Sequence, residues 1–151
     1  MTNSTFIEGY STDGSLHYAP YAEDARVSHS HGWSTAPTSL LTKFVAGIFL
    51  EGPAGSQWRI EPAMGGLNRV AAGYRTTLGA FGVNWTDAGE TGSFETPEGT
   101  NGTAVLRSVN GAQNVTLTSA GVEQILSFAA QPTNRAVFSN LAGGNYTISM
   151  S

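Results

Sequence analysis

The sequence contains no cysteine, which excludes disulfide bonds, zinc sites built from thiolates and a cysteine nucleophile. Charged residues make up only 12% of the chain, and Lys43 is its single lysine. Long exposed helices normally carry many Lys and Glu residues, so this composition favours strands and turns. The Lys and Arg residues number 7, are scattered, and leave a net charge of −4, which argues against nucleic-acid binding.

The sequence also lacks an apolar run of the roughly 18 residues that would span a bilayer. Its 151 residues, 40% of them hydrophobic, suffice to bury a core in one ordinary domain or two small ones. We therefore expect a globular chain with no membrane partner, no nucleic-acid partner and no cofactor.

The motif Asn-x-Ser/Thr, an acceptor for N-linked glycans, occurs five times, at Asn3, Asn84, Asn101, Asn114 and Asn145. This frequency favours a secreted glycoprotein, although a chain rich in Ser and Thr also accumulates such motifs by chance. Residues 1–5 do not resemble a signal peptide. Secretion is therefore expected if the chain is part of a longer precursor.

Residues 36–48 have the features of one α-helix. Ser34 or Thr35 can cap its start, Pro37 suits its first turn, and apolar residues follow at helical spacing. Gly47 places its end in the region 47–52. Its apolar stripe is wider than one sheet edge covers, which predicts a further partner and, for the isolated chain, self-association through this helix.

Short segments of β character follow one another at about ten-residue spacing from residue 56 onward, separated by turn signals. The predicted strands are 56–62, 67–74, 76–85, 93–96, 103–106, 115–118, 125–128, 136–138 and 146–150. This spacing is typical of an antiparallel β-sandwich. Before the helix, residues 1–34 form an aromatic loop or hairpin segment whose turn is predicted at 12–14. The fold class is thus mainly β.

Residues 28–34, SHSHGWS, form the most unusual run of the sequence. His29 and His31 would share one face of a strand and could bind a metal, but no cluster of acidic residues completes such a site. A second interpretation is that the histidines bond a polar ligand while Trp33 provides a flat stacking surface. A third is that His31 and Trp33 simply pack at the start of the helix.

Three motifs occur in an order that resembles the C-terminal stretch of α-L-rhamnosidases of glycoside hydrolase family 78. They are TFIEGY at 5–10, SHSHGWS at 28–34 and PTSLLTKFVAGI at 37–48. WRIEP at 58–62 and SFETPEGT at 93–100 extend the resemblance over nearly the whole chain. It implies that residues 1–52 are the end of an (α/α)6 barrel and residues 53–151 a C-terminal β-sandwich domain, of the fungal type.

The resemblance also implies roles for three residues. Glu8 matches the Glu that serves as general base in these inverting glycosidases, which act on terminal α-L-rhamnosides. His31 and Trp33 match the His and Trp that line the sugar site. Ile7 stands where the family often has Trp. Without the resemblance, Glu8 would be interpreted as an exposed hairpin carboxylate.

Inversion requires a general acid and a general base about 6.5–9.5 Å apart. The family's acid lies far upstream in the barrel, so the resemblance implies that this chain alone is inactive. Two other functions remain open. One is a self-standing carbohydrate-binding β-sandwich protein that uses Trp33, Trp58 or Trp85 as stacking surfaces. The other is a structural or oligomerising module.

Overall fold

The computed structural model describes residues 6–17, 21, 23, 26–130 and 133–151, with Trp33 described in its main chain. The chain divides into two compact units, residues 1–40 and residues 41–151. We call them the N-terminal unit and the β unit, and describe each by itself. No helix in the described ranges is long and apolar enough to cross a bilayer.

The N-terminal unit consists of loops followed by a 3-10 turn, Gly32–Thr35, and the α-helix α1, Ala36–Leu40. The predicted turn at 12–14 is present. The Ser11 N–H donates to the Ser15 carbonyl at 3.0 Å, and Gly14 adopts a φ of +82°, in the left-handed region that suits glycine. Among the described residues of this unit, Val27 is the one buried apolar side chain. The unit therefore has little core of its own.

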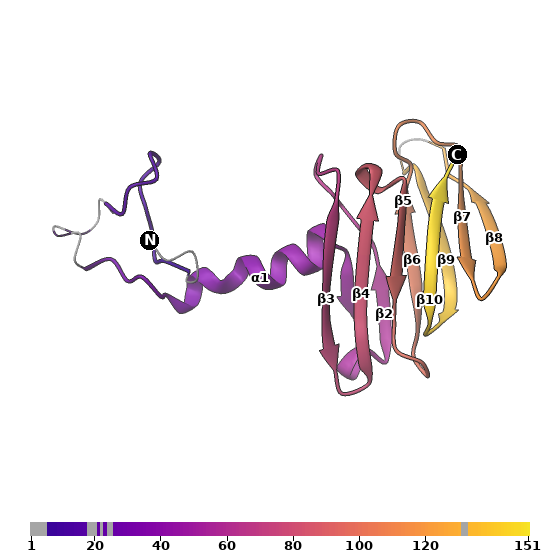
Figure 1. Ribbon diagram of the computed structural model, residues 1–151, viewed down its shortest axis with the longest axis horizontal. Coiled ribbons are helices and arrows are strands. Elements are labelled where there is room, and N and C mark those ends of the chain that lie inside the picture. The colour runs from indigo at the N-terminus through magenta and orange to yellow at the C-terminus, as the bar shows by residue number, and fades with distance from the viewer. Residues whose placement is uncertain (1–5, 18–20, 22, 24–25, 131–132) are drawn as a thin grey trace. The chain divides into compact units, whose positions relative to one another are not determined.

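The described residues of the β unit form ten strands, all of which except β1 carry a label in Figure 1. They are β1 (Ile48–Leu50), β2 (Gln57–Ile60), β3 (Val70–Thr76), β4 (Gly79–Thr86), β5 (Thr91–Glu95), β6 (Asn101–Arg107), β7 (Asn114–Ser119), β8 (Val122–Ser127), β9 (Arg135–Ala142) and β10 (Asn145–Met150). Short 3-10 turns occupy Pro53–Gly55 and Asp87–Gly89. Every strand predicted from residue 56 onward has a counterpart here.

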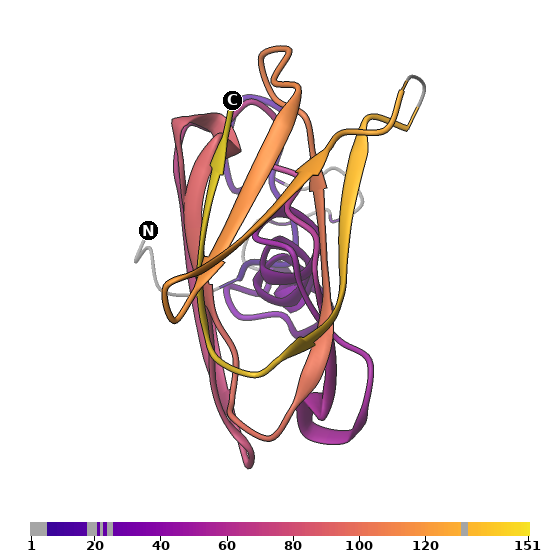
Figure 2. The same ribbon diagram turned by 90° about the vertical axis from the view of Figure 1, so that its right-hand side faces the viewer.

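The strands build two sheets that face each other as two layers (Figure 2). The four-stranded sheet has the order β1-β2-β6-β9, and the six-stranded sheet has the order β3-β4-β5-β10-β7-β8. The predicted β-sandwich is confirmed. One pair, β2 with β6, is parallel; this is possible because β3, β4 and β5 lie between them in the chain, so no tight hairpin joins the pair.

The core lies between the two sheets and is built from alternate residues of each strand. Trp58, Ile60 and Leu106 contribute from the four-stranded sheet, and Phe81 and Trp85 from the six-stranded sheet. The indole N–H of Trp58 donates to the Thr100 hydroxyl at 2.9 Å, so its one polar group is satisfied inside the core.

The helix predicted at 36–48 ends earlier, and its last predicted residue belongs to a strand. Helical backbone continues from α1 through a wider π-type turn, Leu41–Val45, and stops there. Ile48 instead begins β1, is buried and pairs with Ile60 of β2. The cause is Gly47, whose φ of +86° reverses the chain between the helical turn and the strand.

Two neighbours hold this reversal in place. The Glu61 N–H donates to the Gly47 carbonyl at 2.8 Å, and the buried indole N–H of Trp85 donates to the Ala46 carbonyl at 2.8 Å. The last carbonyls of a helix have no partner within the helix, so these donors satisfy groups that would otherwise be buried unpaired. The helix end is thereby fixed to the sandwich.

The two units meet at residues 40 and 41, whereas the sequence-based division falls after residue 52. The difference arises because β1 pairs with β2 in the four-stranded sheet, which places residues 48–50 in the β unit. The assignment of residues 1–52 to the end of a barrel stays a prediction.

Gly47→Ala should destabilise the β unit much more than Gly121→Ala. Both glycines have a positive φ, at which an alanine costs about 1–2 kcal/mol. A Cβ atom at Gly47 would also overlap main-chain atoms of Glu61 and Pro62, whereas a Cβ at Gly121 meets open space. We expect a loss of about 3 kcal/mol or more at Gly47. Urea unfolding followed by tryptophan fluorescence measures both variants, and equal losses would contradict the role assigned to Gly47.

Candidate functional site

Glu8 places a carboxylate with little exposed surface in the N-terminal unit. Its side chain is 6% exposed. The Tyr21 hydroxyl donates to Oε1, and the Ser28 N–H donates to Oε2 at 3.1 Å. In return, the Glu8 N–H donates to the Ser28 carbonyl at 2.9 Å. The interpretation of Glu8 as an exposed hairpin carboxylate is therefore wrong, because the loop at Ser28 folds back over it.

His31 lies next to this carboxylate. Its Nδ1 is 3.8 Å from Glu8 Oε2, and its side chain is 28% exposed. The main chain explains the approach, because the His31 N–H donates to the Phe6 carbonyl at 2.8 Å. Segments 6–8 and 28–31 thus run beside each other. The structure brings together two of the three residues that the motifs single out.

The contacts of Glu8 favour its charged form. The Tyr21 hydroxyl, followed by the Ser28 N–H, lowers the pKa of Glu8 below its ordinary value of 4.5, and a smaller contribution comes from His31. Burial acts in the opposite direction and raises the pKa, but less strongly than the hydrogen bonds lower it. Glu8 is consequently ionised at neutral and mildly acidic pH. An ionised carboxylate can accept a proton but cannot donate one, so this geometry suits a base.

The remaining motif residues are less well placed. Trp33 belongs to the 3-10 turn Gly32–Thr35, and its side chain lies outside the described part of the structure. His29 is exposed. Across the described residues, no three His, Cys, Asp or Glu side chains gather closely enough to hold a metal ion. Among the described residues, no third ligand therefore completes a metal site at His29 and His31.

Two proposed stacking residues are buried, and that prediction was wrong. Trp58 is 1% exposed and Trp85 is 0% exposed. Strand alternation turns both indoles inward, where their N–H groups bond Thr100 and Ala46. Neither ring can stack on a sugar, which leaves Trp33 as the remaining candidate for that role.

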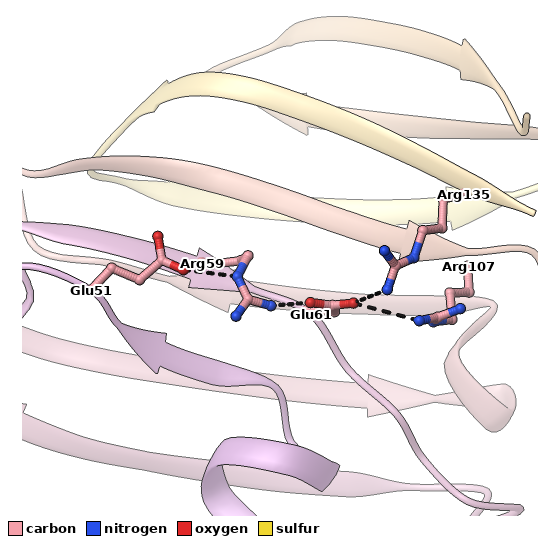
Figure 3. Close-up of polar contacts among 5 residues, drawn as sticks. All are labelled: Glu51, Arg59, Glu61, Arg107 and Arg135. Atoms are coloured by element: carbon pink, nitrogen blue, oxygen red, sulfur yellow. Dashed lines mark hydrogen bonds and ion pairs between the residues drawn. The ribbon is translucent and has the colours of Figure 1, made fainter. Parts of the chain in front are cut away.

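Figure 3 shows a cluster of charged side chains around Glu61 at the four-stranded sheet. Arg59 and Arg135 donate to the Glu61 carboxylate, the second at 2.5 Å, and Arg107 lies 3.6 Å from it. Arg59 also bonds Glu51 at 2.9 Å. Because Arg107 ends β6 and Arg135 begins β9, Glu61 joins three strands, which gives the cluster a structural role. The sequence offered no signal for it beyond scattered charges.

A shallow, open depression of about 900 Å³ lies on the outer side of the six-stranded sheet. Ala71, Gly73, Ala80 and Gly82 are among its lining residues. Aromatic side chains of the strands that line this depression point into the core, where Phe81 and Phe94 are buried.

Two solved structures share the fold of this chain. An α-L-rhamnosidase from Dictyoglumus thermophilum matches with a TM-score of 0.64 and 17% identity over 83% of this chain. An α-L-rhamnosidase from Streptomyces avermitilis, complexed with L-rhamnose, matches with a TM-score of 0.65 and 16% identity over 91% of it. The chain has the fold of part of an α-L-rhamnosidase. It spans 14% and 12% of those two chains, respectively.

No protein-family model and no curated protein matches the chain. The resemblance to α-L-rhamnosidases seen in the motifs is confirmed at the level of the fold; both solved structures are bacterial, so the fungal type stays a prediction. The β unit makes up just under three quarters of the chain. Matches over 83% and 91% of the chain therefore include part of residues 1–40.

Proposed function

We propose that this chain is the C-terminal part of an inverting glycoside hydrolase that acts on terminal α-L-rhamnosides. The observation that carries the proposal is the buried Glu8 carboxylate with His31 at 3.8 Å. The fold shared with two α-L-rhamnosidases supports it, since the matches cover 83% and 91% of this chain. The rhamnoside substrate class is taken from the same resemblance.

In the proposed mechanism, Glu8 is the general base that takes a proton from the attacking water. This role requires an ionised carboxylate, and the hydrogen bonds from Tyr21 and Ser28 favour that form. His31 and Trp33 contact the sugar. His31 is partly exposed and lies next to the base. A side chain that contacts the reacting sugar ring would be expected at such a position.

The general acid comes from another part of the polypeptide in this proposal. The described acidic residues near Glu8 in sequence have other partners: Asp13 accepts the Ser15 N–H at 2.9 Å, and Glu23 pairs with Arg26 at 3.9 Å. Solved α-L-rhamnosidases are several times longer than this chain, so a second carboxyl group has ample sequence in which to lie. A base without its acid cannot complete the inverting reaction.

The chain alone should bind L-rhamnose weakly and should not hydrolyse aryl α-L-rhamnosides. Titration with L-rhamnose should shift the amide NMR signals of Glu8, Ser28 and His31, and D-glucose, the control sugar, should leave them in place. Glu8→Gln should reduce the L-rhamnose shifts. If L-rhamnose shifts none of these amide signals, the proposed sugar site is wrong. If the chain hydrolyses the aryl rhamnoside and Glu8→Gln abolishes this activity, the proposal that the chain lacks a general acid is wrong.

We also propose that the protein is secreted and carries N-linked glycans. Asn84 and Asn145 are exposed on the six-stranded sheet, because the residues that follow them, Trp85 and Tyr146, point into the core. Strand alternation then places each Asn and the Thr two positions later on the outer face. Asn101 of β6 is exposed as well. Glycans at these positions are compatible with the fold.

Secretion from a eukaryotic host should therefore yield a chain whose mass falls on treatment with peptide:N-glycosidase. Asn84→Gln and Asn145→Gln should each remove one glycan, whereas Asn68→Gln, at an exposed asparagine outside the motif, should not. Asn114 accepts a hydrogen bond from Ser127 at 2.8 Å, and Asn3 lies outside the described residues. An unchanged mass on enzyme treatment would contradict the proposal.

We further propose that the isolated chain self-associates through its helical segment. Leu41 and Phe44 are 58% and 51% exposed, and apolar surface left in water costs about 25 cal/mol per Å². Sedimentation equilibrium at micromolar concentration should show a dimer that Leu41→Glu dissociates. Leu78→Glu, at an exposed leucine of the β3–β4 turn, is the matched control and should leave the dimer intact. A strict monomer would rule out this association.

A further inference from the structure

We propose that Tyr21 is a positioning residue for Glu8: its phenolic hydroxyl holds Oε1 and so fixes the orientation of the candidate base. This inference rests on the proposed function and goes beyond the motifs, none of which includes Tyr21. Tyr21 donates to Glu8 from thirteen residues away in the sequence, across a segment with no regular secondary structure in its described residues.

The two oxygens of Glu8 are held in different ways. The main chain holds Oε2, because Ser28 and Glu8 exchange a pair of bonds: the Ser28 N–H donates to Oε2, and the Glu8 N–H donates to the Ser28 carbonyl. Oε1 is held by a side chain, the Tyr21 hydroxyl. The last torsion of a Glu side chain is broad, so a single anchored oxygen leaves the carboxylate free to turn. The Tyr21 bond removes that freedom.

Burial makes this second bond necessary. A carboxylate whose side chain is 6% exposed has lost most of its contact with water. A buried charged oxygen without a donor is strongly unfavourable, so Oε1 needs a partner from the protein. Loss of the Tyr21 hydroxyl would favour either protonation of Glu8 or rotation of its carboxylate toward water, and each would remove a general base from its working geometry.

Tyr21 is suited to this task by its own chemistry. The described titratable groups that act on Glu8 are Tyr21 and His31. A phenol ordinarily titrates near pH 10, so its hydroxyl still carries a proton to donate where a carboxyl group is ionised. The Tyr21 hydroxyl is therefore a neutral donor to the ionised Glu8 carboxylate.

The test compares Tyr21→Phe with Tyr10→Phe, which removes the hydroxyl of an exposed tyrosine in the same unit. Carboxyl ¹³C NMR of the full chain gives the titration midpoint of Glu8 in each variant. Tyr21→Phe should move the Glu8 midpoint to higher pH, and Tyr10→Phe should leave it at the wild-type value. A purely structural role for the ring would leave the Glu8 midpoint in place, because phenylalanine keeps the ring. An unmoved midpoint overturns the proposal.

A second measurement needs no substitution, so it remains informative if Tyr21→Phe fails to fold. In the wild-type chain, the Cζ resonance of Tyr21 should change with pH at the same midpoint as the Glu8 carboxyl carbon, and the Cζ resonance of Tyr10 should not. If the Tyr21 Cζ resonance does not change as Glu8 titrates, the proposal is wrong. The proposed function fails by a different result, the absence of L-rhamnose-induced shifts in the wild-type chain.

Discussion

The reversal at Gly47 is the constraint on which the β unit depends. It stops the helical segment at Val45, starts β1 at Ile48 and brings the Gly47 carbonyl to the Glu61 N–H. The Trp85 indole adds a bond to the Ala46 carbonyl from the opposite sheet. One left-handed residue and two donors thus join the helix end to both layers of the sandwich, and the register of β1 against β2 follows.

Much of the sandwich could be predicted from the sequence, because strand alternation and turn residues are local signals. The strand β1 could not be predicted. Its residues continue the apolar run of the helix, and periodicity alone cannot tell a short buried strand from one more helical turn. The burial of Trp58 and Trp85 was likewise missed, since a large aromatic residue is compatible with either a core or a stacking surface.

The candidate site was predicted in part. The motifs pointed to Glu8 and His31, and the structure places them next to each other. Tyr21 had no signal, and Ser28 lay in the 28–34 motif without an assigned role. Their contacts with Glu8 span loop segments without periodicity, where sequence spacing does not determine distance. The Arg–Glu cluster around Glu61 was also not predicted. Its arginines come from strands that are far apart in the sequence and become neighbours only in the sheet.

The small core of the N-terminal unit has a consequence for its response to acid. With Val27 as the one buried apolar side chain among its described residues, the unit relies on polar contacts, which include those of Glu8. The folded-state pKa of Glu8 lies below its unfolded value. The stabilisation from this carboxylate is therefore complete above the unfolded pKa and is lost as the pH falls through the lower, folded value. Acid thus removes one stabilising contribution from the segment that holds the candidate base.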